Sequence, residues 1–142
     1  MAELQGYHHV SLSVSDLGKS AEWYRQTLGF ETTAEIEGDG FRRTRLRAGN
    51  GLTLTLTAHE QQPGGPFDEH RIGVDHIAFN VGSTEAVQEL KGRFEELGVV
   101  HSEVKQPASG NAMITLRDPD NIQLEVFGGT FDSGHRGADS KP

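Results

Sequence analysis

The sequence repeats one pattern twice, and this internal repeat constrains the fold more than any other feature. Residues 7–59 and 73–127 each open with a short strand pattern, continue with a helix pattern that ends at Leu-Gly, and close with further strand patterns. A spacing of 67 residues separates the two opening histidines, His9 and His76, and later landmarks drift only slightly from it. Such a repeat indicates a duplicated structural unit.

In each repeat, an alternating strand is followed by an amphipathic helix with marked ends. Asp16 is placed to begin the first helix, and Ser83 or Thr84 the second, because their side-chain oxygens can accept the free N–H groups of a first turn. Both helices are expected to end at Leu-Gly, where glycine tolerates the left-handed conformation of a C-terminal cap. Apolar residues at helical spacing mark the predicted buried stripes: Leu17, Ala21, Tyr24 and Leu28, then Ala86, Leu90, Phe94 and Leu97.

The remaining strands fix the predicted fold class. Between each helix and the last strand there is room for two more strands, over residues 32–37 and 40–47 and over residues 99–105 and 111–117. We therefore predict an α+β fold in which two βαβββ modules form a curled mixed sheet around a cleft.

The predicted organisation is a single domain over residues 1–127. Module one covers about residues 7–59 and module two about residues 73–127. Residues 60–72 are rich in Gly and Pro and are interpreted as a linker or mobile flap. Residues 128–142 lose periodicity and apolar side chains, which predicts a flexible C-terminal tail.

Composition narrows the classes of function. Thirteen Lys and Arg residues against 21 Asp and Glu residues give a net charge of −8, so the chain would repel a polyanion. The absence of cysteine excludes thiolate catalysis and Cys-ligated zinc. No apolar run approaches the roughly 20 residues of a membrane-spanning helix, and the first residues lack the layout of a secretory signal. We expect a cytoplasmic protein whose partner is a small molecule, with no nucleic-acid or membrane partner.

Strand alternation places four unusual residues on the polar faces of the sheets. His9 and His76 lie opposite the apolar face of the opening strands, and Thr55 lies opposite that of a closing strand. Glu125 holds the same place as Thr55 in the second module. Polar residues on such a face ordinarily contact solvent. In a duplicated module, however, the first and last strands bring equivalent positions near the pseudo-twofold axis, which predicts that these residues converge.

Three of the four residues can bind a metal. Two imidazoles and one carboxylate form a facial triad that suits Fe2+, Mn2+, Zn2+, Ni2+ or Co2+ and leaves positions open for water or a bidentate substrate. We predict that His9, His76 and Glu125 hold one divalent metal ion per site. Burying Glu125 unpaired would cost several kcal/mol, which a divalent cation could offset. His8 is the alternative to His9 as ligand, but it has the opposite parity and matches Asp75 in the repeat.

Several short motifs, taken together, resemble one known family. Over residues 7–127 the chain resembles the vicinal oxygen chelate superfamily, which includes glyoxalase I, methylmalonyl-CoA epimerase, extradiol dioxygenases, fosfomycin-resistance enzymes and bleomycin-binding proteins. The resemblance implies the glyoxalase/bleomycin resistance/dioxygenase fold, and it places the family's metal ligands on His9, His76 and Glu125. The motifs that carry it are His8-His9-Val10, Val14-Ser15-Asp16-Leu17, Ser20, Trp23-Tyr24, Leu28-Gly29-Phe30, Val74-Asp75-His76-Ile77-Ala78-Phe79, Asp118-Pro119-Asp120-Asn121 and Leu124-Glu125.

The chain departs from individual branches of this family. Thr55 stands where glyoxalase I has a further Glu or Gln ligand and where the epimerase also has a ligand. The remaining 2-His-1-Glu set looks like that of the dioxygenase and fosfomycin branches. Thr115, however, stands where the fosfomycin branch has a tyrosine, and the chain has two modules where most extradiol dioxygenases have four.

The predicted function is that of a divalent-metal-dependent enzyme. The metal would act as a Lewis acid on a small substrate with vicinal oxygens, in lyase, isomerase or dioxygenase chemistry. The alternative is a metal-free protein of the bleomycin-resistance type that binds and sequesters a small molecule or antibiotic. No general base is assigned. Family precedent implies a homodimer, whose site is built within one chain or across two.

A second group of residues is predicted to bind substrate. The repeat matches Arg43 to Met113 and Arg45 to Thr115, all on the predicted polar face, and Thr55 completes the set. Arg43 and Arg45 are interpreted as receiving a carboxylate or phosphate of an anionic substrate. The alternative is that both arginines line a solvated sheet edge, with their stems on apolar surface.

Overall fold

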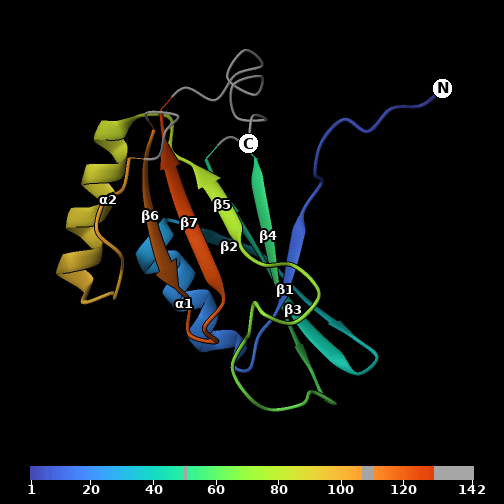
Figure 1. Ribbon diagram of the computed structural model, residues 1–142. Helices are drawn as coiled ribbons and strands as arrows, with labels where there is room; N and C mark the ends of the chain where they lie inside the picture. The colour runs from blue at the N-terminus through green and yellow to red at the C-terminus, as the bar shows by residue number, and fades with distance from the viewer. Residues whose placement is uncertain (50, 107–110, 130–142) are drawn as a thin grey trace. The chain divides into compact units, whose positions relative to one another are not determined.

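The two halves of the repeat fold as two α+β units (Figure 1). The computed structural model describes residues 1–49, 51–106 and 111–129, so residues 130–142 of the predicted tail lie outside the described residues. The first unit spans Met1–Pro66 and the second begins at Phe67.

The first unit is a four-stranded mixed sheet with one helix against it. Its elements are β1 (Val10–Ser13), α1 (Leu17–Leu28), β2 (Glu31–Gly38), β3 (Phe41–Ala48) and β4 (Leu52–His59). The strand order is β1-β4-β3-β2, in which β1 and β4 are parallel and the other pairs are antiparallel. The first and last strands of the module are therefore neighbours.

Over its described residues, the second unit repeats this topology with one strand fewer. Its elements are β5 (Ile77–Asn80), α2 (Thr84–Leu97), β6 (Ala112–Arg117) and β7 (Gln123–Gly128). The strand order is β5-β7-β6, with β5 parallel to β7 and β6 antiparallel to it. Figure 1 shows α2 beside β6 and β7.

The strand predicted over residues 99–105 is wrong. Two isolated bridges to β6 take its place. Between these bridges, the Ser102 Oγ accepts the backbone N–H of Thr115 at 2.9 Å, so a side chain replaces the backbone carbonyl that a continuous ladder would supply. The second module thus keeps the predicted order of elements, but its second strand is reduced to bridges.

The helix ends are confirmed. Asp16 and Ser83 are the N-terminal caps, and each side chain accepts a hydrogen bond from the backbone N–H three residues ahead, at 3.0 and 3.1 Å. Gly29 and Gly98 end the helices with φ angles of 75° and 69°. These angles lie in the left-handed region that favours glycine.

The core of each unit lies between its helix and its sheet. Tyr24 of α1 and Phe94 of α2 are fully buried, as predicted. The buried faces are nevertheless rotated slightly from the predicted stripes, because Ser20 and Thr27 are buried beside Tyr24 and Val87 is buried in α2. Each fully buried large apolar side chain stabilises its unit by roughly 1.5–3 kcal/mol.

The segment over residues 60–72 contains no helix or strand and is attached at both ends. The Gln62 Nε2 donates to the Val14 carbonyl at 3.2 Å, which ties this part to the first unit. The Phe67 N–H donates to the Asp120 carbonyl at 2.8 Å, which ties the following part to the second.

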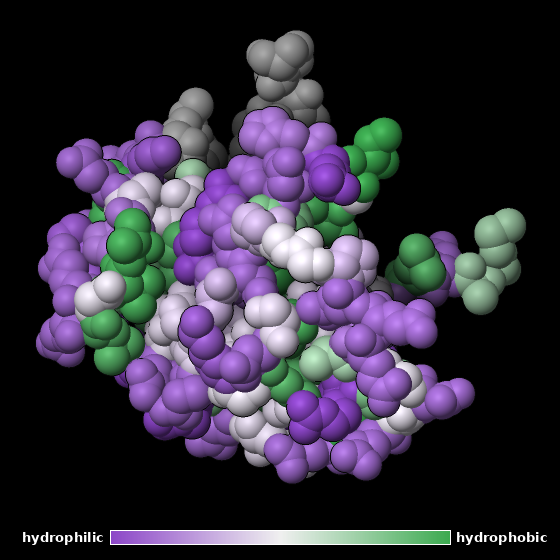
Figure 2. Space-filling view, turned by 90° about the horizontal axis from the view of Figure 1, so that it is seen from below, coloured by the Kyte–Doolittle hydropathy of each residue, from purple (hydrophilic) through white to green (hydrophobic). Residues whose placement is uncertain are grey.

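The surface seen in Figure 2 is mainly hydrophilic, with hydrophobic residues in separate patches. Neither α1 nor α2, the helices of the described residues, is long and apolar enough to cross a membrane. Exposed hydrophobic side chains include Tyr7, Ile72 and Val74, in the segments that lead into β1 and β5.

Candidate metal centre

The second unit brings two of the three predicted ligands together. His76 lies immediately before β5 and Glu125 lies in β7, where it pairs with Ala78 of the parallel neighbour β5. Because side chains alternate along a strand, His76 and Ala78 share a face with Glu125. The His76 Nε2 and the Glu125 Oε2 are 3.5 Å apart.

The surroundings of Glu125 fit a bound cation. Its side chain is 12% exposed, and within the described ranges its one polar contact is with His76. Burying a carboxylate without a paired charge or hydrogen bonds costs several kcal/mol. Two ligand atoms about 2.1 Å from one ion, at an angle of about 90–109°, are about 3.0–3.4 Å apart. The 3.5 Å between the His76 Nε2 and the Glu125 Oε2 is close to this range, so the pair fits a divalent metal.

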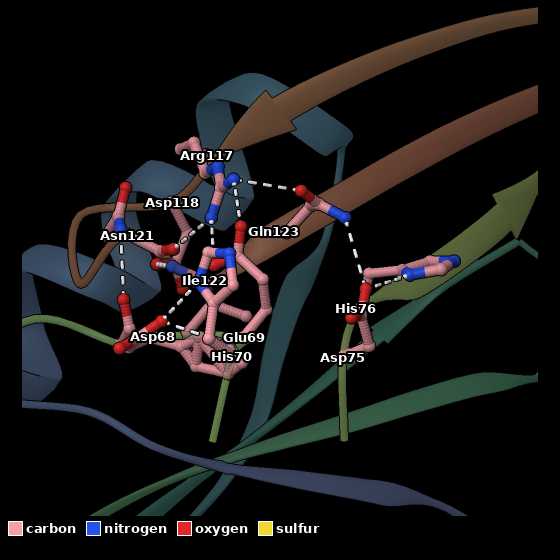
Figure 3. A network of polar contacts seen from close by, with 11 residues as sticks. Asp68, Glu69, His70, Asp75, His76, Arg117, Asp118, Asn121, Ile122 and Gln123 are labelled. Atoms are coloured by element: carbon pink, nitrogen blue, oxygen red, sulfur yellow. Dashed lines mark hydrogen bonds and ion pairs between the residues drawn. The ribbon is translucent and has the colours of Figure 1, made fainter. Parts of the chain in front are cut away.

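The other ring nitrogen of His76 is occupied by the preceding residue (Figure 3). The His76 Nδ1 lies 2.7 Å from the Asp75 Oδ1, and the same oxygen accepts the Gln123 Nε2 at 3.4 Å. A carboxylate on one ring nitrogen leaves the other free to bind a metal, an arrangement common for metal-ligating histidines.

A chain of polar contacts continues from Gln123 to the segment before β5. The Arg117 Nη2 donates to the Gln123 Oε1 at 2.9 Å, and the Arg117 guanidinium donates to both carboxylate oxygens of Glu69 at 2.7 and 3.0 Å. These Arg117 hydrogen bonds lower the pKa of Glu69 from its ordinary 4.5 to about 2.

The sequence prediction missed the parts that Arg117 and Glu69 play in these contacts. Strand alternation could have placed Arg117 and Gln123 on one face, because the two residues pair with each other across β6 and β7. Glu69 gives no such signal, because 48 residues separate it from Arg117 and it lies outside the regular elements.

In the first unit, His9 lies exposed immediately before β1. Its Nδ1 lies 2.8 Å from the Nδ1 of His8, and the two rings meet edge to face with centroids 5.1 Å apart. His8 thus stands to His9 as Asp75 stands to His76. That His9, rather than His8, joins the pair of the second unit stays a prediction.

The polar face of the first sheet carries three of the residues predicted to bind substrate. The Arg43 Nε donates to the Thr57 Oγ1 at 2.9 Å, and its guanidinium lies 4.5 Å from the centroid of the Phe41 ring. Arg45 is exposed and pairs across the strands with Thr55, which is 5% exposed. Over the described residues, neither arginine forms an ion pair with a carboxylate.

The other two predicted residues lie in β6 of the second unit. Thr115 pairs directly with Glu125, as Arg45 pairs with Thr55 in the first unit. Met113 lies two residues away on the same face. The matching registers agree with the repeat on which the substrate-binding prediction rested, and the role of these residues stays a prediction.

A hollow of about 440 Å³ lies beside the N-terminus of α1. Its lining includes Asp16, Arg42 and Thr44, and none of the predicted site residues. Arg42 and Thr44 point to the helix side of β3, opposite the face that carries Arg43 and Arg45. The hollow is therefore separate from the predicted substrate-binding residues of this sheet.

Asp68, Glu69 and His70 also bring ligand atoms within 4.8 Å of one another. The His70 Nδ1 lies 2.8 Å from the Asp68 Oδ1, and this hydrogen bond raises the pKa of His70. Glu69 is held by Arg117. These contacts account for the cluster, and we assign no metal to it.

Comparison with protein families gives a match to the Glyoxalase/Bleomycin resistance protein/Dioxygenase superfamily over residues 6–126. The chain belongs to this superfamily. The predicted family and fold class are thereby confirmed, and the two sheets are consistent with paired modules of this superfamily.

Relatives within the superfamily have different named activities. The chain is 31% identical to the glutathione transferase FosA of Serratia marcescens, over 90% of this chain and 84% of that protein. It is 28% identical to the putative ring-cleaving dioxygenase MhqA of Bacillus subtilis, over 86% of this chain but only 40% of that protein. A glyoxylase/bleomycin resistance protein/dioxygenase domain structure from Frankia sp. EAN1pec superposes with a TM-score of 0.85 at 30% identity, covering 95% of this chain and 99% of the other.

Proposed function

We propose that the chain is a divalent-metal-dependent enzyme acting on a small substrate with vicinal oxygens, and that His9, His76 and Glu125 are its metal ligands. The observation that carries the proposal is the approach of the His76 Nε2 to the mostly buried Glu125 carboxylate, which has no other polar contact in the described ranges. Membership of a superfamily that includes dioxygenases supports it, as does similarity to FosA.

The proposed metal ligands and the neighbouring residues have different roles. A bound divalent ion would supply Lewis acidity toward two adjacent substrate oxygens and stabilise negative charge on them. Glu125 contributes the single negative charge of the ligand set, and the two imidazoles bind as neutral groups. Thr55, in the position of a possible fourth ligand, offers a hydroxyl, which is a poor ligand. The three-residue set leaves open positions for substrate.

The substrate class that fits the first unit is an anion. Arg43 and Arg45 lie on the polar face of a protein with a net charge of −8, and neither pairs with a carboxylate in the described part. Arg43 is oriented by its hydrogen bond to Thr57, which leaves its terminal nitrogens available to a carboxylate or phosphate. Arg45→Ala is expected to raise KM for an anionic substrate with little effect on kcat. Arg42→Ala, on the opposite face of β3, is the matched control.

Metal analysis tests the proposal directly. The protein should be purified without chelator and without a metal-affinity tag, and its metals counted by inductively coupled plasma mass spectrometry. We expect one divalent ion per chain, lost in His9→Ala, His76→Ala and Glu125→Gln. His59→Ala changes an exposed histidine at the end of β4 and should retain the ion. If His8→Ala loses the ion while His9→Ala keeps it, the ligand assignment is wrong.

Absence of metal from every form, even after anaerobic addition of Fe2+ or Mn2+, would contradict the proposal and favour a metal-free binding protein.

Where metal does bind, the reaction class can be narrowed with the reconstituted protein. Oxygen uptake with catechols would indicate dioxygenase chemistry, and loss of methylglyoxal hemithioacetal would indicate isomerase chemistry.

We further propose that the protein is a homodimer. Tyr7 and Val74 occupy equivalent places in the two modules, immediately before His8 and Asp75, and both side chains are exposed. Sedimentation analysis should give twice the chain mass of 15.5 kDa. Co-expression of His9→Ala and His76→Ala chains with different tags then locates the site. If each metal site takes ligands from both chains, a mixed dimer would regain one of its two sites. If each site is built within a single chain, a mixed dimer would regain neither.

A further inference from the structure

We infer that Asp75 is a positioning residue for the metal site: it holds the proton of His76 on Nδ1 and so presents Nε2 as the ligand atom toward Glu125. The inference rests on the proposed metal site, but it makes a claim about the protein without metal that can be tested separately. Asp75 itself is held through Gln123 and Arg117 by Glu69, a residue of the segment between the modules.

The geometry at His76 supports this role. The Asp75 Oδ1 lies 2.7 Å from the Nδ1, a normal hydrogen-bond distance, whereas the Glu125 Oε2 lies 3.5 Å from the Nε2, beyond a short hydrogen bond. A carboxylate can only accept a hydrogen bond, so a neutral His76 must carry its proton on Nδ1. The lone pair of Nε2 then faces Glu125, as a shared cation requires.

Asp75 needs support of its own because its side chain is 61% exposed. The Gln123 Nε2 donates to the same Oδ1 that accepts His76. Since the Gln123 Oε1 accepts from the Arg117 Nη2, the amide is oriented with its nitrogen toward Asp75. Glu69 fixes Arg117 in turn through two hydrogen bonds (Figure 3). The contacts form one continuous series from Glu69, in the segment before β5, to His76.

The first module has the same local arrangement. His8 occupies the position equivalent to Asp75 in the repeat, and its Nδ1 lies 2.8 Å from the Nδ1 of His9. In both modules the residue before the predicted ligand therefore contacts Nδ1 of that histidine.

The tautomer is the first test and requires no metal. Ring ¹⁵N chemical shifts of His76 should be measured in the metal-free protein at about pH 8, where histidine is ordinarily neutral. We expect the proton on Nδ1 in the wild type and in Asp75→Asn, whose side-chain oxygen can still accept. In Asp75→Leu the proton should shift substantially to Nε2. A wild-type proton on Nε2, or an unchanged tautomer in Asp75→Leu, would overturn the inference.

Metal affinity is the second test. Mn2+ binding should be measured by electron paramagnetic resonance, with circular dichroism to confirm folding. We expect Asp75→Leu to bind about 10–100-fold more weakly than the wild type, Gln123→Leu to show a smaller loss, and Asp75→Asn to recover most of the affinity. Glu103→Leu removes the same charge from an exposed side chain that forms no hydrogen bond with the described residues, and should bind as the wild type does.

The two tests separate the inference from the proposed function. Wild-type affinity in Asp75→Leu would overturn the positioning role and leave the metal site standing. Failure of the wild type to bind Mn2+ or Fe2+ would contradict the proposed function, while the tautomer result would still support or overturn the orientation of His76 by Asp75.

Discussion

Thr55 and Thr57 lie two residues apart on the same face of β4, yet of these two only the Thr57 hydroxyl has hydrogen-bond partners among the described residues. The Thr57 Oγ1 accepts from Arg43 and shares a hydrogen bond with the Ser11 Oγ at 2.9 Å. The Thr55 Oγ1 is buried and has no hydrogen-bond partner among the described residues. A buried hydroxyl without a partner is destabilising, because it gives up its hydrogen bonds to water and gains none in return. The two positions therefore differ in what each hydroxyl contributes to stability.

Thr55→Val should accordingly stabilise the protein, because valine keeps the shape of threonine and removes the unsatisfied hydroxyl. We expect an increase of about 1 kcal/mol in the free energy of unfolding, and a decrease of about 1 kcal/mol in the matched variant Thr57→Val. Urea denaturation of both variants beside the wild type measures the difference. Equal destabilisation by the two substitutions would show that the Thr55 hydroxyl has a partner in solution.

At the scale of the element, the features predicted correctly are those that local chemistry decides. Asp16 and Ser83 cap helices because a side-chain oxygen lies within reach of N–H groups three residues ahead. The strand over residues 99–105 was predicted wrongly because a local pattern cannot show a competing interaction from elsewhere. There, the Ser102 hydroxyl bonds to the Thr115 backbone, 13 residues later in the chain, and interrupts the ladder.

The two glycines of α2 give a prediction at this scale. Gly98 ends the helix at a φ of 69°, whereas Gly92 lies inside it with open space where a side chain would begin. Gly98→Ala should destabilise by about 1–2 kcal/mol, because an L side chain is strained in the left-handed region. Gly92→Ala should stabilise by about 0.5–1 kcal/mol, because alanine loses less conformational freedom in a helix. The midpoint of thermal unfolding should fall in Gly98→Ala and rise in Gly92→Ala. A shift of the same sign in both variants would contradict the assigned helix end.

For the whole molecule, the repeat was enough to predict that two residues of the candidate site lie close together. Strand parity and the adjacency of first and last strands predicted that His76 and Glu125 share a face, and the two side chains do approach each other. The contacts of Glu69 could not be predicted in this way. They depend on the path of the segment before β5, and neither parity nor helical spacing applies to a segment outside regular elements. Sequence periodicity therefore predicted which side chains share a face, but not the contacts of Arg117 and Glu69 beside them.

The Glu69 and Arg117 ion pair gives the last prediction, a dependence of stability on pH. In the folded protein the pKa of Glu69 is about 2, against an ordinary 4.5, so between these values the unfolded chain takes up a proton that the folded chain does not. The pair therefore stabilises the fold fully above pH 4.5 and loses its contribution as the pH falls toward 2. Glu69→Gln should show a shallower loss of unfolding free energy over this window than the wild type, measured by urea denaturation at several pH values. Glu103→Gln should follow the wild-type slope, and a Glu69→Gln curve parallel to the wild type would mean that Arg117 does not hold Glu69 in solution.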